Sequence, residues 1–541
     1  MSLRHSQSAR SPPHTPQHQL RSNNNSFASN SSGSTYRVEE DAVIFELGSR
    51  WLRAGFEGES EPKCIVGFGP EESRRVGDYR GWLRGTAAEQ ETPVRLATPD
   101  EWSRPYELWK MNLRDVDLGL VEDKIERSVR ETYNKYLLTD AGVARLVLVL
   151  PSVIPHPLLS SILTTLFSRW RFPSITLLNN AAMATTAAGL RSALVVDIGW
   201  VETVVTSVYE YREVATKRST RAMKALIQET GRLITQLTNG ESQSGDTISV
   251  EFDYCEEFAS RFLWCKPSRS TGQDKLADIS DKRVSIPSPS DPGSSYIDLP
   301  FSKLTEPVEK VLFAQDMADS DLDDEEKPLS LLVYNTLVSL PPDVRGICMS
   351  RIVFIGGGAN IAGVRRRVIN EVGYLVKQYG WSPVRGKVVD QNIKKLQDLK
   401  LSRPPPPNYE TAKEQTDSES SASEGGYETA DEPDTEIDPI EQKLQRARDK
   451  EAVPVVQGVL REVETLGAWA GASLITSLKV RGMVEIEREK YLQHGLAGAT
   501  RDWDHGHKDA KDMNTHSQIP DRRSGLRAGG DRLSWTLAGW G

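Results

Sequence analysis

Two stretches of this chain follow the same pattern, and that repetition restricts the possible folds more than any other feature of the sequence. Residues 42–56 and 193–209 each begin with an apolar strand, continue with an acid, one further residue and a glycine, and end in a second β-rich strand. The acids are Glu46 and Asp197, so the copies stand about 150 residues apart. Self-similar segments indicate duplicated structural units. We therefore predict two related halves whose hairpins face each other.

The segments around these hairpins alternate between strand and helix patterns. Residues 43–46 and 146–150 are β-rich runs, whereas 121–137 carries apolar residues at helical spacing and 158–167 follows a proline-rich turn as another helix. A further strand at 351–355 enters a run of three glycines before another helical segment. Alternation of this kind is typical of the α/β class.

Glycine-tipped hairpins are suited to phosphate, because backbone N–H groups can approach it without obstruction by side chains. Two opposed hairpins can hold a polyphosphate, and acids at their bases can position a hydrated Mg²⁺. A single hairpin or glycine turn of this type is more often only a hairpin or a loop, but their combination in this order predicts a nucleotide cleft. The predicted binding residues are Glu46, Gly48, Ser49, Arg53, Asp197, Gly199, Gly356, Gly357 and Gly358, with Asp197 and Glu46 also reaching Mg²⁺ through water.

Composition excludes several other classes of protein. The chain of 541 residues has a formal charge of −9, which makes it a poor candidate for nucleic-acid binding. Its four cysteines form no C-x-x-C pair, so neither a disulfide framework nor a structural zinc site is expected, and a reducing compartment is indicated. The most apolar region, 146–167, is interrupted by prolines, and no secretory signal is visible. We expect no membrane span.

Polar and charged segments divide the chain into five parts. Residues 1–38, 386–452 and 496–541 have compositions that cannot bury enough apolar surface to offset the entropy of ordering, so we predict two disordered tails and a disordered acidic insert. The main part of the folded core is then 39–385, and its C-terminal part is 453–495.

The order of these motifs resembles that of the actin and actin-related family: phosphate hairpin, connecting helix, second phosphate hairpin, adenosine loop and C-terminal helix. Arg53–Gly58 is similar to the family's K-A-G-F-A-G, Tyr133–Leu137 to its F-Y-N-E-L, and Trp469–Leu478 to its W-I-G-G-S-I-L-A-S-L. Ile355 with the following glycines resembles its adenosine motif. The resemblance implies an actin-like ATPase fold, with duplicated RNase-H-like halves around a cleft for ATP or ADP and with Mg²⁺ possible.

Within the family, the resemblance is strongest to the divergent actin-related subunit at the pointed end of dynactin. Glu59–Ile65 resembles that subfamily's E-T-G-P-R-C-I, and Val311–Asp316 resembles its I-L-F-E-Q-D. The likeness implies a cytoplasmic, cytoskeletal subunit that caps an actin-like filament and supports dynein-driven microtubule transport. Its expected partners are actin-related filament subunits and pointed-end dynactin subunits, with dynein contacted indirectly. The loop that reaches the next subunit in actin lies before Val76-Gly77-Asp78 and is short here.

Departures from the family pattern fall on the residues of hydrolysis. Glu46 replaces the first aspartate, Trp200 replaces an aspartate beside the γ-phosphate, Val201 replaces a glycine and Val204 replaces a histidine. Asn180 stands where the family has the glutamine that orients water. Positioned proton-transfer groups typically contribute ~10²–10⁴-fold in rate. We therefore predict no enzyme, or at most a very slow ATPase. Either a structural nucleotide is retained, which we favour, or Trp200 fills the γ site and leaves ADP or an empty cleft.

Two rival functions remain open from the sequence. The acidic insert also suits a nuclear actin-related subunit of a chromatin-remodelling complex, because such an insert can contact a basic partner. Sugar kinases and heat-shock-type ATPases share the superfold, but no catalytic aspartate for a kinase is evident. P-loop and dinucleotide-binding chemistry are not expected, because neither G-x-x-x-x-G-K-[ST] nor G-x-G-x-x-G is present.

Overall fold

The computed structural model describes residues 42–70, 97–110, 112–239, 246–267, 282–289, 295–315, 317, 322–381, 458–480 and 485–499. The predicted N-terminal tail, the acidic insert, the short loop before Val76-Gly77-Asp78 and the C-terminal tail after residue 499 lie outside these residues, so their predictions stay untested. Residues 496–499 of the predicted C-terminal tail are described and belong to a 3₁₀ helix, Gly495–Ala499. The predicted core segments contain nearly all of the described residues.

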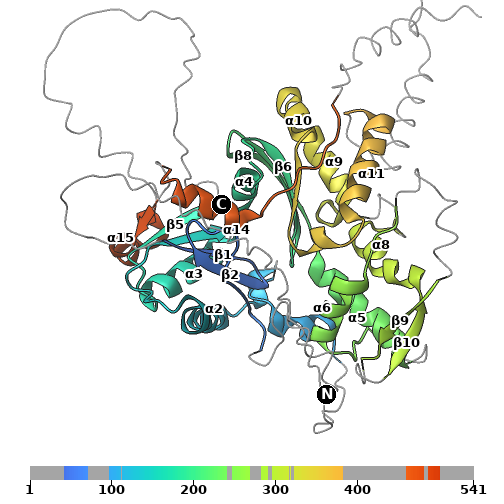
Figure 1. The fold of residues 1–541 in the computed structure, drawn as a ribbon, viewed down its shortest axis with the longest axis horizontal. Coiled ribbons are helices and arrows are strands. Elements are labelled where there is room, and N and C mark those ends of the chain that lie inside the picture. Colours follow the sequence, from blue (N-terminus) through green and yellow to red (C-terminus); the bar gives the residue numbers. More distant parts are fainter. Residues whose placement is uncertain are drawn as a thin grey trace, which may run out of the picture. The chain divides into compact units, whose positions relative to one another are not determined.

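The first half of the fold is built on a six-stranded sheet (Figure 1) with the order β12-β5-β4-β1-β2-β3. Strands β1, β2 and β3 form an antiparallel meander, whereas β4 and β5 run parallel to β1. The bounds are β1 Val43–Leu47, β2 Trp51–Phe56, β3 Cys64–Gly67, β4 Leu146–Leu150, β5 Ser174–Asn179 and β12 Glu485–Glu487.

The second half is built on a four-stranded sheet with the order β11-β6-β7-β8. Here too an antiparallel meander, β6 to β8, is joined by a parallel strand, β11. The bounds are β6 Ala193–Ile198, β7 Thr203–Tyr209, β8 Arg212–Ser219 and β11 Ile352–Ile355, and a separate ribbon pairs β9 Arg283–Pro287 with β10 Tyr296–Pro300.

The strand registers confirm the predicted duplication. Glu46 on β1 pairs with Arg53 on β2, and Asp197 on β6 pairs with Val204 on β7. In both hairpins the acid therefore faces the residue seven positions later. Each meander also receives a parallel neighbour on the outer side of its first strand, β4 beside β1 and β11 beside β6. The α/β interpretation and the two facing hairpins are thus present in the fold.

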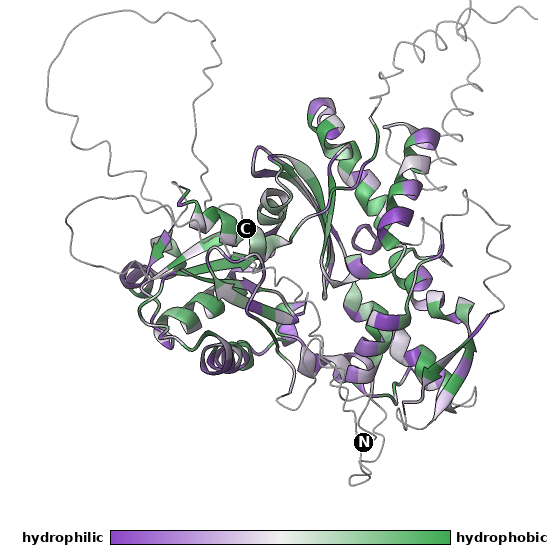
Figure 2. Cartoon of the chain, viewed as in Figure 1, coloured by the Kyte–Doolittle hydropathy of each residue, from purple (hydrophilic) through white to green (hydrophobic). Residues whose placement is uncertain are grey.

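Helices cover the outer faces of both sheets. In α2, Asp117 caps the N-terminus by accepting the Gly119 N–H at 2.9 Å, and Val121, Ile125 and Val129 are buried on one face. Figure 2 shows the result, with polar residues outside and apolar residues along the strands. The bounds are α2 Leu118–Thr132, continued by a π-helical turn at Tyr133–Leu137, α3 His156–Ser168, α9 Leu329–Ser339, α10 Pro342–Met349 and α11 Val364–Tyr379.

Two helices between the sheets join the halves into one core. These are α4, Asn180–Ala187, and α14, Ala468–Ser477, and both contribute buried residues to a cluster that also includes β1, β4, β6 and β11. Gly471 allows α14 to approach α4, since a Cβ atom there would lie 1.9 Å from the Met183 carbonyl oxygen. The indole N–H of Trp469 donates to the Ile44 carbonyl at 3.2 Å, which fixes α14 against β1.

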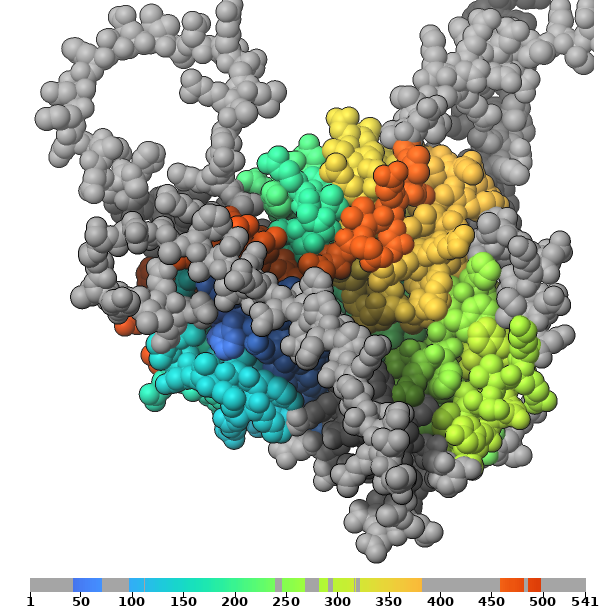
Figure 3. All heavy atoms as spheres, viewed as in Figure 1, coloured from blue at the N-terminus to red at the C-terminus, as the bar shows by residue number. Residues whose placement is uncertain are grey.

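The remaining helices lie beside the second sheet or at its ends. They are α1 Pro99–Ser103, α5 Met223–Asn239, α6 Phe252–Phe262 and α8 Glu306–Leu312. A last helix, α15 Arg488–His494, instead packs against α3 and β12 in the first half. In Figure 3 the orange-red segment that begins at residue 458 lies against the yellow residues of α10 and α11. The Arg461 N–H donates to the Met349 carbonyl at 3.0 Å, so the chain returns to the second half before it enters α14.

The four cysteines are free and buried, in agreement with the predicted absence of a disulfide framework. Among the described residues, no helix combines the length and the apolar character needed to cross a membrane.

Candidate functional site

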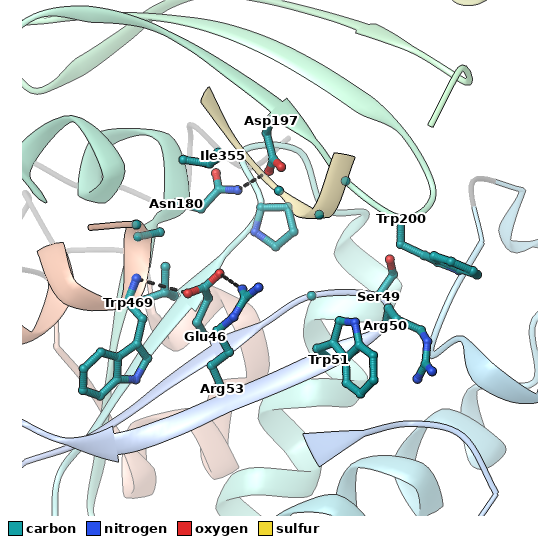
Figure 4. Close-up of a pocket in the computed structure, with 18 of the residues that line it drawn as sticks. Glu46, Ser49, Arg50, Trp51, Arg53, Asn180, Asp197, Trp200, Ile355 and Trp469 are labelled. Atoms are coloured by element: carbon teal, nitrogen blue, oxygen red, sulfur yellow. Dashed lines mark hydrogen bonds and ion pairs between the residues drawn. The ribbon is translucent and has the colours of Figure 1, made fainter. Parts of the chain in front are cut away.

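The tips of the two hairpins and the glycine turn after β11 meet around one cavity of about 450 Å³ (Figure 4). Eight of the nine predicted binding residues line it: Glu46, Gly48, Ser49, Arg53, Asp197, Gly199, Gly356 and Gly357. The sequence-derived prediction that the hairpins enclose a pocket therefore agrees with the structure. What each residue does there differs in several cases from what we expected.

Glu46 uses both oxygens of its carboxylate within the protein. Oε1 pairs with the Arg53 guanidinium at 2.5 Å, and Oε2 accepts the Trp469 backbone N–H at 3.1 Å. Trp469 lies in the first turn of α14, where backbone N–H groups have no partner within the helix. Glu46 on strand β1 thus caps the N-terminus of α14. Arg53 pairs with this carboxylate within the protein.

Asp197 is tied to Asn180. The Asn180 side-chain amide donates to Asp197 Oδ2 at 2.8 Å, while Asn179 caps α4 by accepting the Ala181 N–H at 2.9 Å. The assignment of Asn180 to the cleft therefore agrees with the structure. Burial, reinforced by the nearby negative charge of Glu46, raises the pKa of the Asp197 carboxyl to about 6.

The backbone N–H groups of Gly48 and Gly199 are already hydrogen-bonded within the protein. The Gly48 N–H donates to the Trp51 carbonyl at 2.9 Å, and the Gly199 N–H donates to the Glu202 carbonyl at 3.1 Å. Each bond closes the turn of its own hairpin, and phosphate binding at these two residues stays a prediction. Ser49 is buried and accepts the Leu108 N–H through its carbonyl at 2.7 Å.

The glycines after β11 serve close packing. Gly356 has a φ of +83°, and a Cβ atom there would lie 2.4 Å from the Ile198 carbonyl oxygen and 2.5 Å from Asp197 Oδ1. Gly358 does not line the cavity, since it is buried against the Ile198 side chain. Gly358 is thus the one predicted binding residue outside the cavity lining, and Gly357 lies at the cavity wall.

Trp200 lies at the Ser49 end of the cavity, away from Glu46 (Figure 4). Trp200 is 9% exposed, and its indole N–H donates to Glu107 Oε2 at 3.2 Å. Its ring packs edge-on against Phe252, with 5.7 Å between the ring centroids. Next to it, Glu202 lines the cavity, and burial raises the pKa of its carboxyl to about 7, with Arg218 opposing the shift.

Sequence reasoning missed Arg50, Glu107, Glu202 and Glu256. Arg50 stands at the tip of the first hairpin, yet its side chain is buried and paired with Glu256, which is 206 residues away. A charged residue at a hairpin tip normally indicates solvent exposure, so no local pattern in the sequence marks this pair.

Comparison with known proteins agrees with this geometry. Residues 37–237 match the family model of actin. The chain contains an actin-family domain. The predicted fold class, an actin-type fold, is thereby confirmed. The chain is also similar to Actin-related protein 4 of Schizosaccharomyces pombe, with 25% identity over 176 residues. That match covers 32% of this chain and 36% of the relative, so the chain spans about a third of the length of the curated relative it matches.

Actin-family domains generally bind a nucleotide with Mg²⁺. Whether this cleft fits such a ligand depends on the charge and the hydrogen bonding of the residues that line it. The Glu46 carboxylate and the Arg53 guanidinium are paired with each other, and the second Glu46 oxygen already accepts the Trp469 N–H. Asp197 and Glu202 line the same cavity as two further acidic side chains, which do not attract phosphate. No group of three or more potential metal-ligating side chains occurs in the part of the chain that the structure describes. The arrangement does not fit a magnesium polyphosphate.

Proposed function

We propose that this protein is a non-polymerising actin-related subunit that caps the pointed end of the actin-like filament of dynactin and so supports dynein-driven microtubule transport. The observation that carries the proposal is the internal pairing of the cleft. Glu46 is bound by Arg53 and by α14, and Asp197 is bound by Asn180. A filament that turns over needs a hydrolytic cycle, whereas a terminal subunit needs only a rigid shape.

The absence of turnover is part of the same proposal. Val204 stands opposite Asp197 in the hairpin and offers no proton-transfer group, and the Trp200 indole points to Glu107. We expect purified protein to release no phosphate from MgATP above a buffer control. Phosphate release at a rate comparable to that of a polymerising actin would contradict this part of the proposal.

One face of the molecule is suited to docking on a filament end. Leu474 on α14 is 45% exposed, and Leu478, the residue that caps the C-terminus of the helix four positions later, is 65% exposed. At its opposite end, actin contacts the next subunit through a loop. The corresponding segment of this chain, before Val76-Gly77-Asp78, is short. We infer that the protein contacts filament subunits through the α14 face and offers no grip for a further subunit.

Sedimentation tests the capping proposal directly. With MgATP, the purified protein is expected to remain in the supernatant, yet to associate with short actin-like filaments at one molecule per filament end. Replacement of Leu478 by Glu is expected to abolish that association, whereas replacement of the exposed Leu492 on α15 serves as the matched control. Pelleting of the protein alone as long filaments would refute the proposal.

A second candidate keeps one specific observation in its favour. The similarity to Actin-related protein 4 of Schizosaccharomyces pombe, together with the acidic composition of 386–452, suits an actin-related subunit of a nuclear chromatin-remodelling complex. Affinity purification of the tagged full chain, with mass spectrometry of the partners, separates the two. Recovery of filament and pointed-end dynactin subunits from the cytoplasm supports the first function, and recovery of a remodeller ATPase from nuclei supports the second.

A further inference from the structure

Arg50 crosses the cleft from the tip of the first hairpin to the second half. Its Nε and Nη2 donate to Glu256 Oε1 and Oε2 on α6 at 3.3 and 3.0 Å, a two-pronged contact that fixes both side chains. Arg50 is 2% exposed, and its guanidinium stacks 3.9 Å above the Trp51 ring. A buried charge of this kind depends on its partner, because loss of the partner leaves it without solvation.

Glu107 makes a second connection between the halves. Its backbone is held by the first half, since Leu108 N–H donates to the Ser49 carbonyl and Lys124 on α2 donates to the Glu107 carbonyl at 2.6 Å. Its buried carboxylate accepts from the Trp200 indole and from Lys224 on α5, the latter at 3.0 Å. Both donors belong to the second half.

Aromatic rings fill the space between these two connections. Phe252 at the start of α6 stacks on Tyr106 with a centroid distance of 3.8 Å and an interplanar angle of 10°. Trp102 lies 5.0 Å from the same ring, and its indole N–H donates to the Val250 carbonyl at 2.7 Å. Among the described residues, none from α5 or α6 lines the cavity, so Phe252 lies behind the cavity wall, where it contacts the lining residue Trp200.

The geometry points to a latch: Arg50–Glu256, Glu107 with Trp200 and Lys224, and the rings around Phe252 hold the cleft closed in place of a bound nucleotide. A nucleotide in an actin-family cleft contacts both hairpins and thereby bridges the halves. Here direct side-chain contacts bridge the same halves, and Arg53 and Glu46 at the cavity neutralise each other. The closed form is therefore the stable state without a ligand, in contrast to the retained structural nucleotide predicted from the sequence.

Nucleotide content and amide hydrogen exchange of the full-length protein test this inference. Protein purified without added nucleotide is expected to release less than about one-tenth of a molar equivalent of adenine nucleotide on denaturation. Addition of 1 mM MgATP, compared with EDTA, is expected to leave exchange at residues 48–51 and 199–202 unchanged. About one equivalent of released nucleotide, or slower exchange at those tips with MgATP, would overturn it.

Variants separate the latch from general stability. Glu256→Gln is expected to raise exchange at 48–51 about tenfold, because the Arg50 charge loses its partner. Asp246→Asn, which removes an exposed ion pair with Arg232 that does not cross the cleft, is the matched control and should leave those amides unchanged. Equal exchange in both variants would contradict the latch. If Glu256→Gln does not fold, the comparison of wild-type exchange with MgATP and with EDTA still tests the latch. The latch and the capping function fail independently, because the exchange experiments do not depend on whether the protein sediments with filaments.

Discussion

Replacement of Glu46 by Gln isolates the carboxylate that the structure places between β1, β2 and α14. Gln has the same length and shape, so packing around it is retained. One carboxamide oxygen can still accept a hydrogen bond, but the NH₂ group then faces either the Arg53 guanidinium or the Trp469 N–H, both of which are donors. The variant therefore loses one of the two contacts and the negative charge.

The expected cost follows from these contacts. Loss of an N-terminal cap costs about 0.5–2 kcal/mol, and a hydrogen bond to a charged group contributes about 1.5–3 kcal/mol. The ion pair itself contributes less, about 0.2–1 kcal/mol, because the Arg53 side chain is 36% exposed and is solvated when the pair is broken. Since one contact survives, we expect Glu46→Gln to lower the free energy of unfolding by roughly 1–2 kcal/mol.

Urea unfolding followed by tryptophan fluorescence measures this change, and a double-mutant cycle with Arg53→Met separates its parts. The coupling between the two substitutions should be about 0.2–1 kcal/mol, and the remainder reports the cap on α14. Glu46→Asp, the residue that the family pattern has, is expected to be no more stable than wild type, because it is one methylene too short to reach both partners. A change of less than about 0.3 kcal/mol for Glu46→Gln would refute the capping role.

Three further predictions concern other parts of the molecule. The pKa of Glu202 is about 7 against an ordinary 4.5, so the folded state binds this proton more tightly than the unfolded state. The free energy of unfolding therefore falls as pH rises from about 4.5 to 7 and is level above. Glu202→Gln should remove roughly 2–3 kcal/mol of that fall, as measured by denaturant unfolding at about pH 5 and pH 8. Gly471→Ala should destabilise strongly, by about 1–3 kcal/mol or more, because its Cβ meets the Met183 carbonyl, and a thermal melt within error of wild type would contradict this. Gly373→Ala on α11 has an ordinary neighbour, Leu460 at 3.6 Å, and should raise stability by about 0.5–1 kcal/mol in the same assay.

Much of the fold is determined by patterns that are local in the chain. The hairpins at 42–56 and 193–209 alternate around an acid and a glycine, so their strands, their turn and even the position of the acid follow from about fifteen residues each. Helix α2 is equally local, because a buried stripe at 121, 125 and 129 defines its inner face. Repetition of the hairpin then predicts two halves with a cleft between them.

The sequence alone thus determined the duplicated α/β architecture, the cavity and eight of its residues. Tertiary structure decided what those residues do. Arg50 binds Glu256, which lies 206 positions away in the sequence, and Glu46 binds the backbone of Trp469, which lies 423 positions away. The partner of a charge depends on which distant segments fold beside it, and neither spacing nor composition carries that information. For this reason the sequence pattern predicts where the cavity lies, whereas only the tertiary structure shows which ion pairs and helix caps its residues form.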